Sequence, residues 1–150
     1  MTSHTIRAAF AAAAVILLPT VALAADDVPD ITGTWTGKTY TIVAGKGGHW
    51  PQNMGTFEKP GLFEKDLKIT LTGQDGRRFW GTVTITADGG PTDEPFIGEF
   101  VPGSERVVIA DTDGYFDGRF EGDGFSFCYA HAGGESHTSV VSCTEVKRRR

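Results

Sequence analysis

The chain has 150 residues, of which 39% are hydrophobic and 22% are charged, and its formal net charge is −5 at pH 7. This length suits one domain with a single hydrophobic core. The acidic balance argues against nucleic acid and anionic membranes as partners. The even pair of cysteines favours a disulfide in an oxidising compartment.

The first 24 residues are typical of a secretory signal peptide. Arg7 supplies the basic start, an apolar run covers residues 8–18, and Ala22-Leu-Ala24 forms a small-residue cleavage site. Cleavage removes Arg7 from the 14 Lys and Arg and none of the 19 Asp and Glu, which leaves 13 against 19, a net charge of −6. We expect a periplasmic or secreted protein with no membrane span after cleavage, whose residues 25–30 form a linker.

The first predicted strand covers residues 31–43, which are rich in threonine, aromatic and β-branched residues. Residues 44–64 follow without helical or strand periodicity and contain many glycines and prolines, so we expect a loop of about 20 residues. Connections this long are often functional lids. His49 and Trp50 offer a titratable and an aromatic group for a binding site; the alternative is that Trp50 only plugs the end of the fold.

From residue 66 onward, short alternating segments are separated by tight turns, which is the pattern of an antiparallel meander. Phe79 lies on the apolar side of its segment, and Phe100 is expected to point inward from a later one. No stretch shows a sustained helical period. The predicted strands are 67–71, 77–86, 95–101, 106–110 and 115–120.

The last two strands form a predicted hairpin over residues 124–147. A pairing that places Cys128 opposite Cys143 has its midpoint inside the Gly-Gly turn, and the same register puts Tyr129 opposite Ser142. Because side chains alternate between faces, the cysteines point away from the aromatic face. We predict an external Cys128–Cys143 disulfide and a core face made of Phe125, Phe127, Tyr129, Val140 and Val146.

Short antiparallel strands leave unpaired backbone groups at the edges of an open sheet, and closure removes those edges. We therefore predict an all-β domain over residues 31–147, an eight-stranded antiparallel up-and-down barrel, with a β-sandwich as the alternative. The interior of such a barrel holds packed side chains or one small ligand. Residues 148–150 form a basic tail, typical of a solvated chain end.

The first strand resembles the opening of the calycins, a group that includes lipocalins, avidins and related small binding proteins. Gly33-Thr-Trp35 matches their G-x-W motif, a few residues into the first strand. The resemblance implies that Gly33 and Trp35 form the barrel floor, beneath a basic residue such as Lys147 or Arg148. The opening looks especially like that of avidins, but Gly37 stands where their pattern has asparagine, so biotin binding is not carried over.

Three other segments look like parts of a family of small exported bacterial proteins without an assigned activity. These segments are residues 45–51, 73–81 and 128–131. The resemblance extends the expectation of an exported protein and implies no reaction.

Catalytic and metal motifs are not recognisable. Neither the histidines nor the acidic run at residues 111–117 have the spacing of a metal site, so we predict no metal and no cofactor. No Gly-x-Ser-x-Gly elbow occurs and a disulfide would consume both thiols, so no catalytic residue is assigned. Asp93 and Glu94 fall in a predicted turn, where solvated charge is usual.

Our first hypothesis is a non-enzymatic exported barrel that binds a small, partly apolar ligand. The alternative is a protein-binding barrel, such as an exported protease inhibitor, whose interior is filled, since many of the ten phenylalanines in the whole chain are inward by pattern. An isomerase-like or cyclase-like enzyme would need a polar constellation inside the barrel, of which only Tyr129 and His131 are recognisable. The predicted ligand-binding residues are His49, Trp50, Phe79, Phe100, Phe125, Phe127 and Tyr129.

Overall fold

The computed structural model describes residues 28–45, 55–87, 89–133 and 138–150. The predicted signal peptide, His49 and Trp50 lie outside these ranges. Within them every regular element is a strand, and no helix is long and apolar enough to cross a bilayer. The strands are β1 (Gly33–Ala44), β2 (Gly61–Asp75), β3 (Arg78–Ala87), β4 (Gly90–Phe100), β5 (Arg106–Ala110), β6 (Tyr115–Glu121), β7 (Gly124–Ala132) and β8 (Ser139–Arg148).

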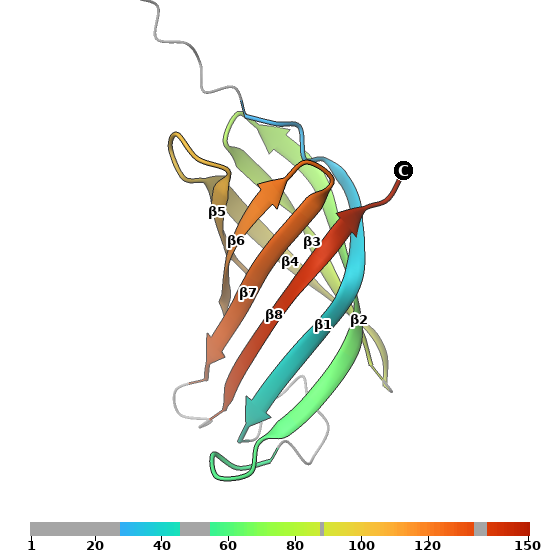
Figure 1. Cartoon of the computed structure of the whole chain (residues 1–150), viewed down its shortest axis with the longest axis vertical. Helices are drawn as coiled ribbons and strands as arrows, with labels where there is room; N and C mark the ends of the chain where they lie inside the picture. The colour runs from blue at the N-terminus through green and yellow to red at the C-terminus, as the bar shows by residue number, and fades with distance from the viewer. Residues whose placement is uncertain (1–27, 46–54, 88, 134–137) are drawn as a thin grey trace, which may run out of the picture.

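Each strand pairs antiparallel with the next, and β1 also pairs with β8, which closes the sheet into a barrel (Figure 1). Closure gives a partner to the backbone groups that an open sheet leaves unpaired at its edges. The prediction of an eight-stranded up-and-down barrel is confirmed, and the sandwich alternative is wrong.

The up-and-down order divides the barrel into two ends. The end that carries the β1–β2, β3–β4, β5–β6 and β7–β8 connections, at the bottom of Figure 1, is called the mouth here. The opposite end, where β1 begins and β8 ends, is called the floor. The direction of a strand and the position of a residue along it therefore show whether an inward side chain lies near the mouth or near the floor.

The strand β2 begins at Gly61, six positions before the predicted start at residue 67. Its early residues pair with β1, so that Lys65 faces Thr39. Glycine, proline and charged residues have weak strand propensity, but the ladder offered by a neighbouring strand overrides it. The predicted loop over residues 44–64 was therefore too long.

The strand β4 is also longer than predicted, because it begins at Gly90 and not at residue 95. Asp93 and Glu94 pair with Thr84 and Val83 on β3. The prediction that these two carboxylates sit in a turn was wrong, and Glu94 lies half-buried in the strand.

The floor half of the interior is filled by an apolar core. Phe79, Phe100 and Phe125 are each at most 1% exposed. The Phe120 and Phe125 rings stack with their centres 4.0 Å apart. Gly98 leaves space for the Phe79 ring, because a Cβ atom at position 98 would lie 2.4 Å from it. Packed aromatic and aliphatic side chains thus occupy this half of the interior.

The floor itself is built on Trp35, which is 1% exposed. Its Nε1 donates a hydrogen bond to the Ile31 carbonyl at 3.0 Å. The guanidinium carbon of Arg148 lies 5.6 Å from the Trp35 ring centre, within cation–π range. Arg148 also donates hydrogen bonds to the carbonyls of Asp30 and Thr32. The basic residue over the tryptophan is Arg148, whereas Lys147 is exposed.

The final hairpin has the predicted register. Cys128 faces Cys143, and Tyr129 faces Ser142. The two sulfurs are bonded at 2.07 Å, and both cysteines are exposed on the outside of the barrel. The predicted external disulfide and inward aromatic face are confirmed.

Candidate functional site

The mouth half of the interior combines buried hydroxyls with a small second apolar cluster of Val43 and Val140, against which Phe63 and Tyr129 pack. Thr39 and Thr41 on β1 and Ser142 on β8 point inward and form what we call the hydroxyl trio. The three residues are 5%, 5% and 7% exposed. Thr41 Oγ1 donates to Ser142 Oγ at 3.0 Å, and Thr39 Oγ1 makes a short contact with the same oxygen. Hydroxyls at this depth need such partners, because an unpaired buried hydroxyl costs free energy.

Lys65 brings a positive charge to the same half of the barrel. It is 8% exposed and lies directly opposite Thr39 in the β1–β2 ladder. Its Nζ lies 5.6 Å from the centre of the Phe63 ring, and Phe63 faces Thr41. The ammonium therefore extends along β2 toward the mouth.

An open hollow of about 480 Å³ lies against β1 and β2 near the mouth. Leu62 is 76% exposed and Tyr40 is 62% exposed, so much of its wall is accessible apolar surface. The Glu64 carboxylate pairs with Lys38 at 2.9 Å. The lining residues are Tyr40, Thr41, Ile42, Leu62, Phe63 and Glu64. Because Tyr40, Ile42, Leu62 and Glu64 are exposed outward residues, the hollow lies on the outer face of the β1–β2 ladder, whereas the Thr41 hydroxyl points inward to Ser142.

On the other wall of the mouth, Tyr129 and His131 of β7 approach Asp113. The Tyr129 hydroxyl donates to Asp113 Oδ1 at 2.8 Å. Burial, together with this bond, raises the pKa of the Tyr129 phenol well above its ordinary value. His131 Nδ1 lies 3.4 Å from Asp113 Oδ2, but the buried nitrogen has no hydrogen bond of acceptable geometry among the described residues.

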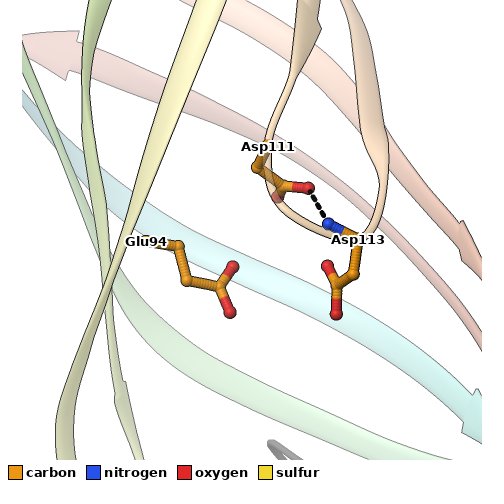
Figure 2. A group of neighbouring side chains, drawn as sticks. All are labelled: Glu94, Asp111 and Asp113. Atoms are coloured by element: carbon orange, nitrogen blue, oxygen red, sulfur yellow. Dashed lines mark hydrogen bonds between the residues drawn. The ribbon is translucent and has the colours of Figure 1, made fainter.

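Three carboxylates gather at the same wall, as Figure 2 shows. Glu94 extends from β4, and Asp111 and Asp113 belong to the β5–β6 turn. Carboxylate oxygens from all three lie within 4.8 Å of one another, and oxygen ligands at such spacing suit hard cations. Asp111 Oδ1 accepts hydrogen bonds from the backbone N–H groups of Asp113 at 3.1 Å and of Gly114 at 2.7 Å. The Asp111 carboxylate thereby shapes the turn that presents Asp113.

The predicted ligand-binding residues fall into separate places. The four phenylalanines are at most 5% exposed and belong to one apolar core, whereas Tyr129 lies at its boundary with the polar half. His49 and Trp50 lie outside the described residues. Gly33 and Trp35 are at the floor, as expected. The phenylalanines are Phe79, Phe100, Phe125 and Phe127.

Sequence reasoning missed the hydroxyl trio, Lys65 and Glu94. Two signals for the trio were present: threonines alternate along the first strand, and the hairpin register placed Ser142 opposite inward-facing Tyr129. Lys65 and Glu94 gave no such signal, because both stand in stretches that resemble loops. Their inward direction follows only from the ladders that extend β2 and β4.

Comparison of the chain with models of known families, with curated proteins and with solved structures finds no match.

Proposed function

We propose that this protein is a non-enzymatic, exported, calycin-like barrel that binds a small, partly apolar ligand at its mouth. The observation that carries the proposal is the hollow against β1 and β2. Its wall is apolar at Tyr40, Ile42 and Leu62, and Thr41 and Glu64 are polar residues of the same lining. Binding sites for small molecules combine these features: mostly apolar lining with a few polar groups that fix orientation.

The division of the interior supports the same placement. The aromatic core occupies the floor half, so the polar half and the hollow are the parts of the barrel suited to contact a ligand. Export is supported by the disulfide, which persists in oxidising compartments, and by the sequence of residues 1–24. The Arg148–Trp35 contact at the floor supports the resemblance to calycins.

The test is native mass spectrometry of the protein purified from an exporting host, before and after denaturation. We expect an additional small-molecule mass that denaturation removes. Leu62→Ser should lose this mass, whereas the control Ile97→Ser, which alters an equally accessible outward isoleucine on β4, should keep it. A bare mass for the wild type, or equal retention in both variants, would count against the proposed site.

Protein binding is the second candidate, and the filled floor half favours it. Seven phenylalanines occupy the described core, so part of the interior is closed to any ligand, as expected for a solid scaffold that presents loops to a partner. Under this alternative, Leu62→Ser would weaken capture of an exported protein and no small molecule would accompany the purified chain.

A further inference from the structure

A contiguous apolar surface lies on the outside of the barrel, over β3 to β6. Ile97 lies directly opposite Trp80 in the β3–β4 ladder and opposite Ala110 in the β4–β5 ladder. Tyr115 continues the row opposite Ala110, and Val108 is the next outward residue along β5. The exposed fractions are 69% for Ile97, 59% for Tyr115, 47% for Val108 and 46% for Trp80. We call the surface formed by these five residues the outer patch.

Trp80 gives the outer patch a rigid aromatic anchor. It faces Gly73 across the β2–β3 ladder, and a Cβ atom at position 73 would lie 2.2 Å from the indole ring. The ring therefore lies directly against the Gly73 backbone, while the rest of its surface stays accessible. A side chain that is already held in place loses little conformational entropy when a partner covers it, and tryptophan often contributes a large part of the binding free energy at interfaces.

Charged residues that border the outer patch are paired within the chain. Val108 lies between Glu99 and Asp117 in the two ladders of β5. Arg77 pairs with Glu99 at 3.7 Å, and Arg106 donates from Nε to Asp117 Oδ1 at 2.8 Å. Each arginine balances one carboxylate, so this face is locally neutral although the whole chain has a net charge of −5. Two copies of an acidic protein repel each other least where neutral faces meet.

The apolar surface on β1 and β2 differs in this respect. Lys38 there lies between two carboxylates, Glu64 at 2.9 Å and Asp66 at 3.3 Å, which leaves that face with an excess of negative charge. The acidic group of Figure 2 does not alter the outer patch in the same way, because its Asp113 carboxylate accepts from the inward Tyr129. Of these two apolar surfaces, the outer patch is the one on which a second copy meets the weaker repulsion.

The exposed fractions of its members give the outer patch about 500 Å² of accessible surface, near the upper end for the largest apolar patch of a monomer. A homodimer interface buries about 800 Å² on each partner, of which about 65% is apolar. The outer patch thus supplies the apolar area that such an interface needs, and the paired charges supply its polar rim. We propose that this chain forms a two-fold dimer in which the outer patches of two copies cover each other. The proposal goes beyond the proposed function, because the hollow lies on other strands.

Sedimentation velocity of the disulfide-bonded protein over a range of concentrations tests the dimer. We expect a monomer–dimer equilibrium with a dissociation constant of about 1 μM or below, as interfaces of this size have. Val108→Glu should raise this constant about a hundredfold or more, because the added carboxylates would meet Glu99 and Asp117 at the contact. The matched control Val141→Glu adds the same charge at an outward valine of β8, which is 46% exposed, and should leave the constant unchanged.

A second variant, Ile97→Ser, covers the case in which Val108→Glu fails to fold, as judged by circular dichroism. It should raise the dissociation constant about tenfold. Its monomer should still carry any small molecule found by native mass spectrometry, which separates the dimer from the proposed function. A wild type that stays monomeric at every concentration would overturn the dimer. A dimer that Val108→Glu and Ile97→Ser leave intact, or that Val141→Glu weakens equally, would also overturn the contact. A monomeric wild type that binds another exported protein through Val108 would assign the outer patch to that partner instead.

Discussion

At the scale of single residues, Arg148 combines a cation–π contact with hydrogen bonds to the backbone. Its guanidinium lies over Trp35 and donates to two backbone carbonyls of the segment that precedes β1. That segment is also held by Gln74, whose side chain accepts from the Ile31 N–H and donates to the Pro29 carbonyl, each at 3.0 Å. Both side chains therefore fasten the N-terminal segment across the floor.

Arg148→Met should lower the free energy of unfolding by about 2 kcal/mol, because it removes two hydrogen bonds and the cation–π contact while it keeps the aliphatic stem. Urea titration followed by tryptophan fluorescence measures this. Arg150→Met, which alters an exposed ion pair with Asp123, is the control and should leave the midpoint unchanged. Equal shifts for the two variants would show that Arg148 does not hold the floor.

Tyr129 is the residue from which we predict a pH dependence. Its pKa is raised by burial and by the bond to Asp113. Above about pH 10 the unfolded chain loses the phenolic proton while the folded protein keeps it. The unfolded state then binds fewer protons, so the free energy of unfolding falls as pH rises.

Tyr129→Phe should therefore make the loss of stability between pH 9 and 11 shallower, although it lowers stability at pH 7 by removing the bond to Asp113. Urea midpoints across this pH range measure both effects. The exposed Tyr40, changed to Phe, is the control. If the stability of Tyr129→Phe falls with pH as steeply as that of the wild type, Tyr129 is not the residue responsible for the pH dependence.

At the scale of elements, the β7–β8 hairpin is joined both by its ladder and by the disulfide. The bond closes a sequence separation of 15 residues and lies on the outer face, opposite the inward Phe127 and Tyr129. The core face of the hairpin is thus independent of the sulfurs, and the disulfide acts mainly by restricting the unfolded chain.

The double variant Cys128→Ala/Cys143→Ala should fold to the same barrel with a free energy of unfolding lower by about 3 kcal/mol, the value for a loop of this length. Urea unfolding gives the loss, and near-ultraviolet circular dichroism checks that the aromatic packing is kept. An unchanged midpoint would contradict the stabilising role, and a collapsed near-ultraviolet spectrum would show that the core depends on the bond.

At the scale of the whole molecule, the barrel joins an apolar half to a polar half along the same eight strands. β1 shows the change within one element: Trp35 is inward at the floor, and Thr39 and Thr41 are inward near the mouth. The floor half buries the large cluster around Trp35 and the phenylalanines, whereas the mouth half buries only the small Val43–Val140 cluster beside hydroxyls, whose hydrogen bonds contribute less net stability. Local stability should therefore decrease toward the mouth.

Amide hydrogen exchange followed by NMR should show this gradient. Ladder amides near Trp35, Val146 and Phe125 should exchange more slowly than those near Val43, Val140 and His131, because local opening needs less free energy at the mouth. Addition of a ligand should slow exchange at the mouth first. Uniform protection along β1 would contradict the division into two halves.

The sequence alone determined the last hairpin. Its register depends on residues close together in the chain, and period-two alternation, a glycine-rich turn and the cysteine pair all indicate the same pairing. The strand count and the avoidance of open edges were enough to predict the barrel. Only the tertiary structure decided that Lys65 and Glu94 point into the mouth. Their local sequences disfavour strands, and pairing with β1 and β3 draws them into the sheet. The polar site follows from long-range pairing, because residues distant along the chain come to the same level of the barrel only when the sheet closes.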